Sequence, residues 1–327
     1  MKKLPPEELK ILAEGHTIVP VSVEIFSDVR TPIQILKSLQ EKSSQFYILE
    51  SVESGESWGR YTFLGYDPSA LIYGLDGVTT IEMQGKKEIS ERSAHEVIGD
   101  FLKKYKSPKV SSLPPFTGGL VGYFAYEYVK YVEKNLVLNA SNPHGFLDFH
   151  LMLFDKVIAF DHFRQKIYLI VNIETRELEK NYSEALLTLE KMKELVFSCV
   201  SDVPCGESAE ISNFKANFSE AQYCEMVETA KKHIFEGDIF QVVLSNRLEA
   251  DFSGDSLWAY RKLRTVNPSP YMFYINFDNM QIAGASPETL VSLKDGALAT
   301  YPLAGTCRRG ETQAEDEELI NALLTNE

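Results

Sequence analysis

The longest strand-like stretch of the chain places the strongest limit on its fold. It runs from Phe149 to Ile173, with the sequence FHLMLFDKVIAFDHFRQKIYLIVNI, and it predicts two strands that turn back on each other near 161–165. The stretches HTIVPVSVEIF and FYILES are rich in β-branched and aromatic residues and also predict strands. Helices are expected singly among the strands, without strict strand–helix–strand repeats. This order favours an α+β fold with a largely antiparallel sheet.

Three of the expected helices carry start signals. The segment TPIQILKSLQ has Thr31 as its cap and Pro32 at the first helical position. Two later helices begin with a capping box, in which a serine is followed three residues later by Glu or Gln. These pairs are Ser93 with Glu96, and Ser219 with Gln222. A further helix is expected over 183–197, and the polar segment 198–213 after it, which contains Pro and Gly, is the best candidate for a linker.

The charge and the cysteines exclude several classes of protein. The net charge is −14, which argues against nucleic acid as a main partner because phosphate binding needs a basic surface. No apolar run is long enough to span a bilayer, and the start MKKLPPEELK lacks the apolar core of a secretory signal, so a cytoplasmic protein is expected. The four cysteines include no CxxC pair, so neither a disulfide framework nor a structural metal site is predicted.

Two stretches could carry chemistry, although the residues alone leave each open. In DIFQVVLSNRLEA, apolar residues alternate with others such as Gln241, which predicts a strand that is either half-solvated or lines a pocket with its polar face. In YPLAGTCRRG, Gly305 lets a ligand approach the backbone, while Thr306 offers a hydroxyl and an amide. A small-residue loop after a strand is also consistent with an ordinary turn.

Several motifs in one order point to a family. Read together, ILES with WGRYTFLG, GGLVGYFAYEYV, GDIFQVVLS, NPSPYMFY, SPETLV and PLAGTCRRG resemble the anthranilate synthase large-subunit family (component I), a branch of the chorismate-utilising enzymes. The resemblance implies large, mostly antiparallel, sandwich-like β-sheets flanked by helices. It also implies an N-terminal component I region at 1–197, the linker at 198–213, and the start of the chorismate-binding domain at 214–327.

Two positions distinguish among the members of this family. Where isochorismate and salicylate synthases carry a Lys that activates water, this chain has Gln241, which has no titrating group. Where aminodeoxychorismate synthase typically carries a nucleophilic Lys, this chain has Ala304. The resemblance therefore implies direct attack of ammonia on chorismate, giving anthranilate and pyruvate. The nearest alternative is an aminodeoxychorismate synthase with an atypical Ala304, and another is a catalytically inactive tryptophan-binding module.

The resemblance also implies ligands and partners. Gly305 and Thr306 would contact chorismate, and Mg²⁺ would hold the ring carboxylate of that substrate. The metal ligands and an essential Glu of the family are expected beyond Glu327, so no metal ligand is assigned in these 327 residues and the chain is expected to be inactive alone. Ammonia would come from a separate glutamine amidotransferase subunit, component II.

A feedback site for tryptophan is implied as well. Its residues fall in the ILES and WGRYTFLG motifs and in the NPSPYM turn. By motif match they are Ser51, Glu50, Arg60, Pro270, Tyr271 and Met272. An aromatic ligand against Pro270 and Tyr271 suits their side chains, and Ser51 could bind the amino or carboxylate group of that ligand.

Overall fold

The protein is described by a computed structural model, which covers residues 6–28, 30–51, 59–133, 135–138, 141–198, 209–302 and 305–325. The chain forms two compact units. One contains Met1–Ser198 together with Asn267–Glu327, and the other contains Cys199–Val266. These units do not coincide with the predicted regions, because strands that follow the second unit pair with strands that precede it.

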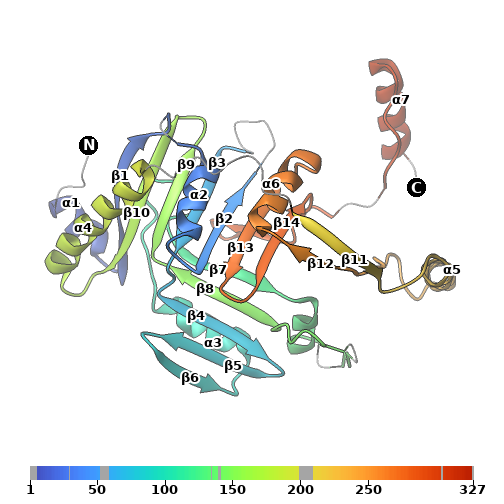
Figure 1. The fold of residues 1–327 in the computed structure, drawn as a ribbon, viewed down its shortest axis with the longest axis horizontal. Coiled ribbons are helices and arrows are strands. Elements are labelled where there is room, and N and C mark those ends of the chain that lie inside the picture. Colours follow the sequence, from blue (N-terminus) through green and yellow to red (C-terminus); the bar gives the residue numbers. More distant parts are fainter. Residues whose placement is uncertain are drawn as a thin grey trace. The chain divides into compact units, whose positions relative to one another are not determined.

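A seven-stranded antiparallel sheet forms the centre of the first unit (Figure 1). Its strands in chain order are β1 (Ile18–Phe26), β2 (Gln45–Glu50), β3 (Tyr61–Tyr66), β9 (Lys156–Asp161), β10 (Lys166–Glu174), β13 (Tyr271–Phe277) and β14 (Gln281–Ser286). They lie in the order β1-β10-β9-β3-β2-β13-β14. The predicted turn near 161–165 is confirmed, since β9 and β10 pair from Asp161 with Lys166 onward.

The first part of the 149–173 stretch belongs to a second antiparallel sheet. Its strands are β4 (Ala70–Leu75), β5 (Val78–Met83), β6 (Lys86–Ser90), β7 (Gly119–Phe124) and β8 (Phe149–Phe154). They lie in the order β6-β5-β4-β8-β7. The chain passes from β8 to β9, and so from one sheet to the other, at Asp155.

The two sheets pack face to face through a shared apolar layer. Met152 and Phe154 of β8 meet side chains of the larger sheet there, among them Tyr47, Ile275 and Phe277. The rings of Tyr47 and Phe154 contact edge to face, with their centroids 4.7 Å apart. This packing confirms the predicted α+β fold with large, antiparallel, sandwich-like sheets.

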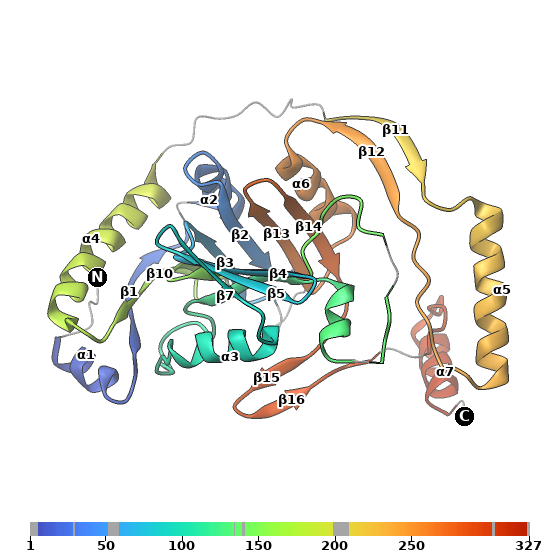
Figure 2. The same ribbon diagram turned by 90° about the horizontal axis from the view of Figure 1, so that it is seen from below.

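Helices pack on both sheets (Figure 2). Those on the larger sheet are α1 (Pro6–Ala13), α2 (Pro32–Gln40) and α4 (Leu178–Phe197), and α3 (Ala94–Lys103) packs on the smaller one. Thr31 caps α2 as predicted, since its side chain accepts a hydrogen bond from the backbone of Gln34. Ser93 makes no side-chain cap bond to α3, so the capping box predicted there is wrong. Among the described helices, none has both the length and the apolar character needed to cross a bilayer.

The second unit contains a two-stranded sheet and two helices. These are β11 (Glu210–Ala216), α5 (Glu220–Glu236), β12 (Leu248–Ser253) and α6 (Ser256–Val266). α5 begins at the predicted capping box of Ser219 and Gln222, and Gly237 ends it with a φ of 83°. β11 starts inside the predicted linker, of which 199–208 lie outside the described residues.

The strand predicted for DIFQVVLSNRLEA is wrong over most of its length. Residues 239–247 have no regular secondary structure, and β12 begins only at Leu248. No described strand pairs with them, and a strand is stable only when a neighbour takes its backbone hydrogen bonds.

In the first unit, the remaining short elements are η1 (Tyr126–Tyr131), β15 (Ser292–Lys294), β16 (Ala297–Ala299) and α7 (Gln313–Leu324).

Candidate functional site

Antiparallel pairing brings two of the predicted ligand-binding segments together. Glu50, the last residue of β2, pairs with Met272 of β13. Continuing this register by one residue places Ser51 beside Tyr271. The ILES and NPSPYM motifs, which are far apart in the chain, therefore meet at the ends of adjacent strands about 5 Å apart.

The alternation of side chains divides these residues between the two faces of the sheet. Phe273 belongs to the apolar layer between the sheets, so Tyr271, two residues earlier, and Ser51 beside it face the same layer. Glu50 and Met272 face the other way, and both are buried. These four predicted residues thus form two pairs, with Ser51 and Tyr271 on the face toward the layer and Glu50 and Met272 on the opposite face.

The line of side chains that contains Ser51 continues across the neighbouring strands. Tyr61 of β3 pairs with Asp161 of β9. Continuing the register of β2 with β3 two residues beyond the Leu49–Phe63 pair places Tyr61 on the far side of Ser51 from Tyr271. Tyr271 in turn pairs with Ser286 of β14. One face of the sheet thus carries Asp161, Tyr61, Ser51, Tyr271 and Ser286 in that order, and we call this line the polar row.

Arg60 is fixed at one end of the polar row. Its Nε donates to Oδ1 of Asp161 at 3.1 Å, and its Nη2 donates to Oδ2 at 2.8 Å. Burial alone would raise the pKa of the Asp161 carboxyl, but the hydrogen bond from Arg60 and the other donors outweigh burial and lower that pKa. The same bond raises the pKa of Arg60, so both groups are charged at neutral pH.

Ser51 offers an unused hydroxyl in the polar row. Its Oγ is buried and has no hydrogen-bond partner among the described residues. The hydroxyl of Tyr271 is committed to Thr289, and the Tyr271 side chain is half-buried, as is Pro270 before it. A buried polar group without a partner costs about 1–3 kcal/mol, which a ligand would recover by hydrogen-bonding to it. A cation, a free hydroxyl and an aromatic ring together suit a ligand with an anionic group and an apolar ring.

A second polar group surrounds Glu50 on the opposite face. Thr62 Oγ1 lies 2.8 Å from Nε2 of His162, and Thr62 is buried. Burial lowers the pKa of His162, and the carboxylates of Glu50 and Asp161 partly oppose that change. Sequence reasoning missed Asp161, Thr62 and His162, whose only signal is a polar side chain within an otherwise apolar strand or at its end.

The predicted chorismate residues are exposed. Gly305 and Thr306 follow β16 in a segment without regular secondary structure, and Ala304 lies outside the described residues. Gln241 is exposed in the irregular segment of the second unit. The assignment of these four residues to chorismate chemistry therefore stays a prediction from motifs.

One group of described side chains has the spacing to hold a metal ion. It consists of His233, Glu236 and Asp238 at the C-terminal end of α5, and all three are exposed. Nδ1 of His233 already lies 2.8 Å from Oδ2 of Asp238. Mg²⁺ prefers oxygen ligands in octahedral geometry, and this group supplies an imidazole nitrogen. The group therefore does not fit the magnesium ion that the resemblance implies.

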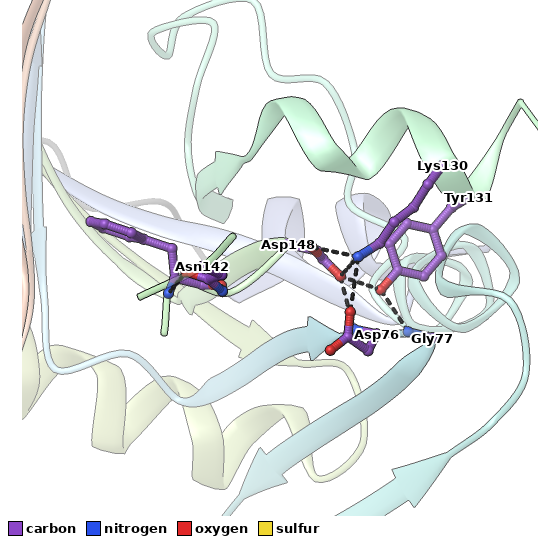
Figure 3. Close-up of polar contacts among 7 residues, drawn as sticks. Asp76, Gly77, Lys130, Tyr131, Asn142 and Asp148 are labelled. Carbon is purple, nitrogen blue, oxygen red and sulfur yellow. Dashed lines mark hydrogen bonds and ion pairs between the residues drawn. The ribbon is translucent and has the colours of Figure 1, made fainter. Parts of the chain in front are cut away.

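A buried carboxylate away from the polar row was not predicted from the sequence (Figure 3). Asp148 accepts hydrogen bonds from the Tyr131 hydroxyl at 2.6 Å and from Lys130 Nζ at 3.0 Å. It also accepts one from the backbone nitrogen of Asp76 at 2.9 Å, and the amide of Gly77 donates to Tyr131 at 2.9 Å. Since its members satisfy one another, this network connects η1 to the turn between β4 and β5 and offers no free group to a ligand.

Comparisons with known proteins agree with the fold and the motifs. Residues 47–327 match the family described as chorismate binding enzyme. Anthranilate synthase component 1 from Acetivibrio thermocellus is 36% identical, and that from Aquifex aeolicus is 37% identical, each over 98% of this chain and 66% of its own length. This chain thus spans just under two-thirds of the length of these relatives.

Two solved structures share the fold. The crystal structure of anthranilate synthase component I from Streptococcus pneumoniae has a TM-score of 0.67 at 30% identity, covering 93% of this chain and 64% of its own. The menaquinone-specific isochorismate synthase from Escherichia coli has a TM-score of 0.54 at 17% identity, covering 98% of this chain and 63% of its own. At that identity the second similarity concerns the fold alone.

Proposed function

The chain belongs to the chorismate binding enzyme family, and we propose that within this family it acts as an anthranilate synthase component 1. In the proposed reaction ammonia adds to the chorismate ring, the ring hydroxyl leaves as water, and pyruvate is eliminated to give anthranilate. The observation that carries this proposal is the identity of 36% and 37% to two proteins of that name along 98% of this chain. Ammonia is proposed to come from a glutamine amidotransferase subunit, component II.

Two residues support ammonia as the nucleophile. Gln241 cannot remove a proton from water, because its amide does not titrate. Ala304 has no side-chain nucleophile and so cannot form a covalent intermediate with the ring. Gly305 and Thr306 are proposed to bind chorismate through the backbone and the hydroxyl. Mg²⁺ is proposed for the family reaction as a counter-charge to the ring carboxylate, and the described residues assign it no site.

Product identification tests the reaction. The protein expressed from its complete reading frame is supplied with chorismate, Mg²⁺ and an ammonium salt, and the products are separated by chromatography. Anthranilate with an equal amount of pyruvate is expected. Accumulation of aminodeoxychorismate would favour the alternative synthase, and isochorismate would show that water is the nucleophile. Glutamine should replace the ammonium salt only when component II is added.

Exchange of one side chain tests the choice of nucleophile. Ala304→Lys would place a cation and a competing amine beside the ring, so anthranilate formation should fall. Unchanged turnover and product would show that this position does not discriminate. Ala304→Gly, which adds neither charge nor nucleophile, is the matched control.

The polar row is proposed to bind tryptophan as a feedback inhibitor. Support comes from the register that sets Ser51 beside Tyr271, from the buried Ser51 hydroxyl that has no described partner, and from Arg60, which Asp161 holds at one end of the row. Ser51→Phe should raise the tryptophan concentration needed for half-inhibition, because its ring would occupy space that the ligand needs. Overpacking of that kind costs about 1–3 kcal/mol. Inhibition that was unchanged in this variant would place the inhibitor elsewhere.

A further inference from the structure

The direction of the Arg60 side chain is fixed by Asp161. The two hydrogen bonds between them form a fork, from Nε to Oδ1 at 3.1 Å and from Nη2 to Oδ2 at 2.8 Å. Oδ1 also accepts a hydrogen bond from the backbone nitrogen of Arg164 at 3.0 Å, which holds the carboxylate itself in place. Asp161 is only 1% exposed, so water does not compete for its oxygens.

Two aromatic rings restrict the guanidinium further. Its central carbon lies 4.8 Å from the ring centroid of Tyr61 and 5.5 Å from that of Phe163. A guanidinium has five N–H donors in one plane, and Asp161 takes one on Nε and one on Nη2. The remaining hydrogens of Nη1 and Nη2 form a second fork at the end of the group. No described residue accepts a hydrogen bond from this end fork.

Arg60, which carries this end fork, and Ser51 lie next to the ends of two neighbouring strands, β3 and β2. Arg60 immediately precedes Tyr61, and continuing the register of β2 with β3 two residues beyond the Leu49–Phe63 pair sets Tyr61 beside Ser51. Adjacent strands are about 5 Å apart, which is within reach of an arginine side chain. Ser51 Oγ is buried and has no described partner. Two sets of unused donors therefore occur on neighbouring strands of the polar row.

We propose that Asp161 is a positioning residue for an amino-acid effector: by occupying the side of the Arg60 guanidinium, it directs the end fork to the carboxylate of a ligand held at Ser51. This inference rests on the proposed regulatory site and deepens it. Because Asp161 balances the charge of Arg60, recognition depends on the direction of the donors and not on net charge. A planar carboxylate matches two parallel N–H donors, whereas a lysine would offer only a point charge.

Calorimetric titration tests this role with two probes. One is L-tryptophan, and the other is L-tryptophanamide, which keeps the ring and the amino group but lacks the carboxylate. The protein expressed from its complete reading frame should bind tryptophan more tightly than the amide. Asp161→Asn should weaken tryptophan binding about tenfold or more and leave tryptophanamide binding unchanged, since an amide neither fixes nor neutralises the guanidinium in the same way.

Two further variants make the result decisive. Arg60→Gln should also abolish the preference for tryptophan over its amide, and an unchanged preference would overturn the inference even if Asp161→Asn fails to fold. Asp100→Asn removes an exposed carboxylate that pairs with Arg92 and should change neither titration.

The outcomes separate this inference from the function on which it rests. If Asp161→Asn weakens both probes equally, or weakens neither, the positioning role is wrong while the effector site stands. If the unmodified protein does not bind tryptophan, the proposed regulation fails first and the inference fails with it.

Discussion

Asp148 is only 4% exposed, and nearby donors keep its carboxyl charged. Burial alone would raise its pKa, but hydrogen bonds from Tyr131 and Lys130 and from the Asp76 backbone outweigh burial and lower it. We expect Asp148→Asn to reduce the free energy of unfolding by about 2–3 kcal/mol, because the amide leaves partly buried Lys130 with only the exposed carboxylate of Asp76 as its counter-charge. Urea denaturation followed by circular dichroism at pH 7 measures this loss.

A control and a pH series complete that measurement. Asp100→Asn removes an exposed carboxylate paired with Arg92 and Lys103, and such pairs contribute about 0–1 kcal/mol. The pKa of Asp148 is lower in the folded protein than in the unfolded chain, where it is about 4. Its contribution is therefore complete above that value and is lost as the pH falls through the folded-state pKa. A difference between the two proteins that persisted undiminished to pH 2 would contradict this account.

His150 shows the reverse case, a buried base that stays neutral. Its Nε2 has no hydrogen-bond partner among the described residues, and its ring centroid lies 4.5 Å from that of Phe277. Burial lowers its pKa to about 4. An unfolded chain, with a histidine pKa of about 6.5, takes up a proton between these values that the folded protein does not. The neutral His150 should therefore lower the free energy of unfolding by about 3 kcal/mol as the pH falls from 6.5 to 4.

Replacing this histidine should remove part of the acid sensitivity. Denaturation midpoints measured from pH 7 down to pH 4.5 should fall less steeply for His150→Phe than for the unmodified protein. His144→Phe changes an exposed histidine and should leave the slope unaltered. Identical slopes for His150→Phe and the unmodified protein would show that His150 does not control the acid response.

At the scale of elements, close packing restricts which strands can lie together. Gly65 of β3 lies against the buried ring of Tyr47, and a Cβ there would come 2.4 Å from Cε1 of that ring. We expect Gly65→Ala to displace the ring and lower the free energy of unfolding by about 1–3 kcal/mol. A Cβ at Gly99 of α3 would meet no atom of another element within 4 Å, so Gly99→Ala should be neutral or stabilise the helix by up to about 1 kcal/mol. Thermal unfolding of the two variants compares them, and equal effects would refute the packing argument.

The sequence predicted the ends of helices where the signal is local. The caps at Thr31 and Ser219 formed because each needs only residues within one turn. Ser93 has the same spacing to an acidic residue and makes no cap bond, so the pattern permits a cap without enforcing it. α4 begins at Leu178, five residues before the predicted start at 183. The prediction missed this start because no cap residue marks it: Glu177, which precedes the helix, makes no side-chain cap bond.

Strand pairing was less predictable because it depends on distant residues. The alternation around Gln241 looks like that of a strand, but no described strand lies beside it. Conversely, nothing local to Glu50 indicates that it pairs with Met272. The family resemblance selected both segments, and only the register showed that Ser51 and Tyr271 share a face while Glu50 and Met272 face away.

At the scale of the whole molecule, burial is distributed unevenly along the chain. Every residue of β8 is buried, as are most residues of β9 and β10. In the second unit, β11, α5 and β12 contain no buried residue. Large apolar side chains are exposed there, among them Phe235 at 92% and Phe240 at 100%. In the first unit, α7 also buries none of its described residues.

This distribution predicts the pattern of amide hydrogen exchange. Backbone amides are protected by the free energy needed to open them, and elements with few buried apolar contacts open at little cost. We expect amides of β9 and β10 to exchange about 10²–10³-fold more slowly than those of α5, β11 and α7 in the 327-residue chain. Mass spectrometry of peptides after timed exchange measures the rates.

The capping boxes provide an internal comparison, because α2 and α5 begin with the same cap yet only α2 buries an apolar face. Slow exchange in α2 with fast exchange in α5 would show that packing, and not capping, sets the protection. Equally slow exchange in both would mean that the exposed face of α5 is covered in solution, and the expected order of stability would then be wrong.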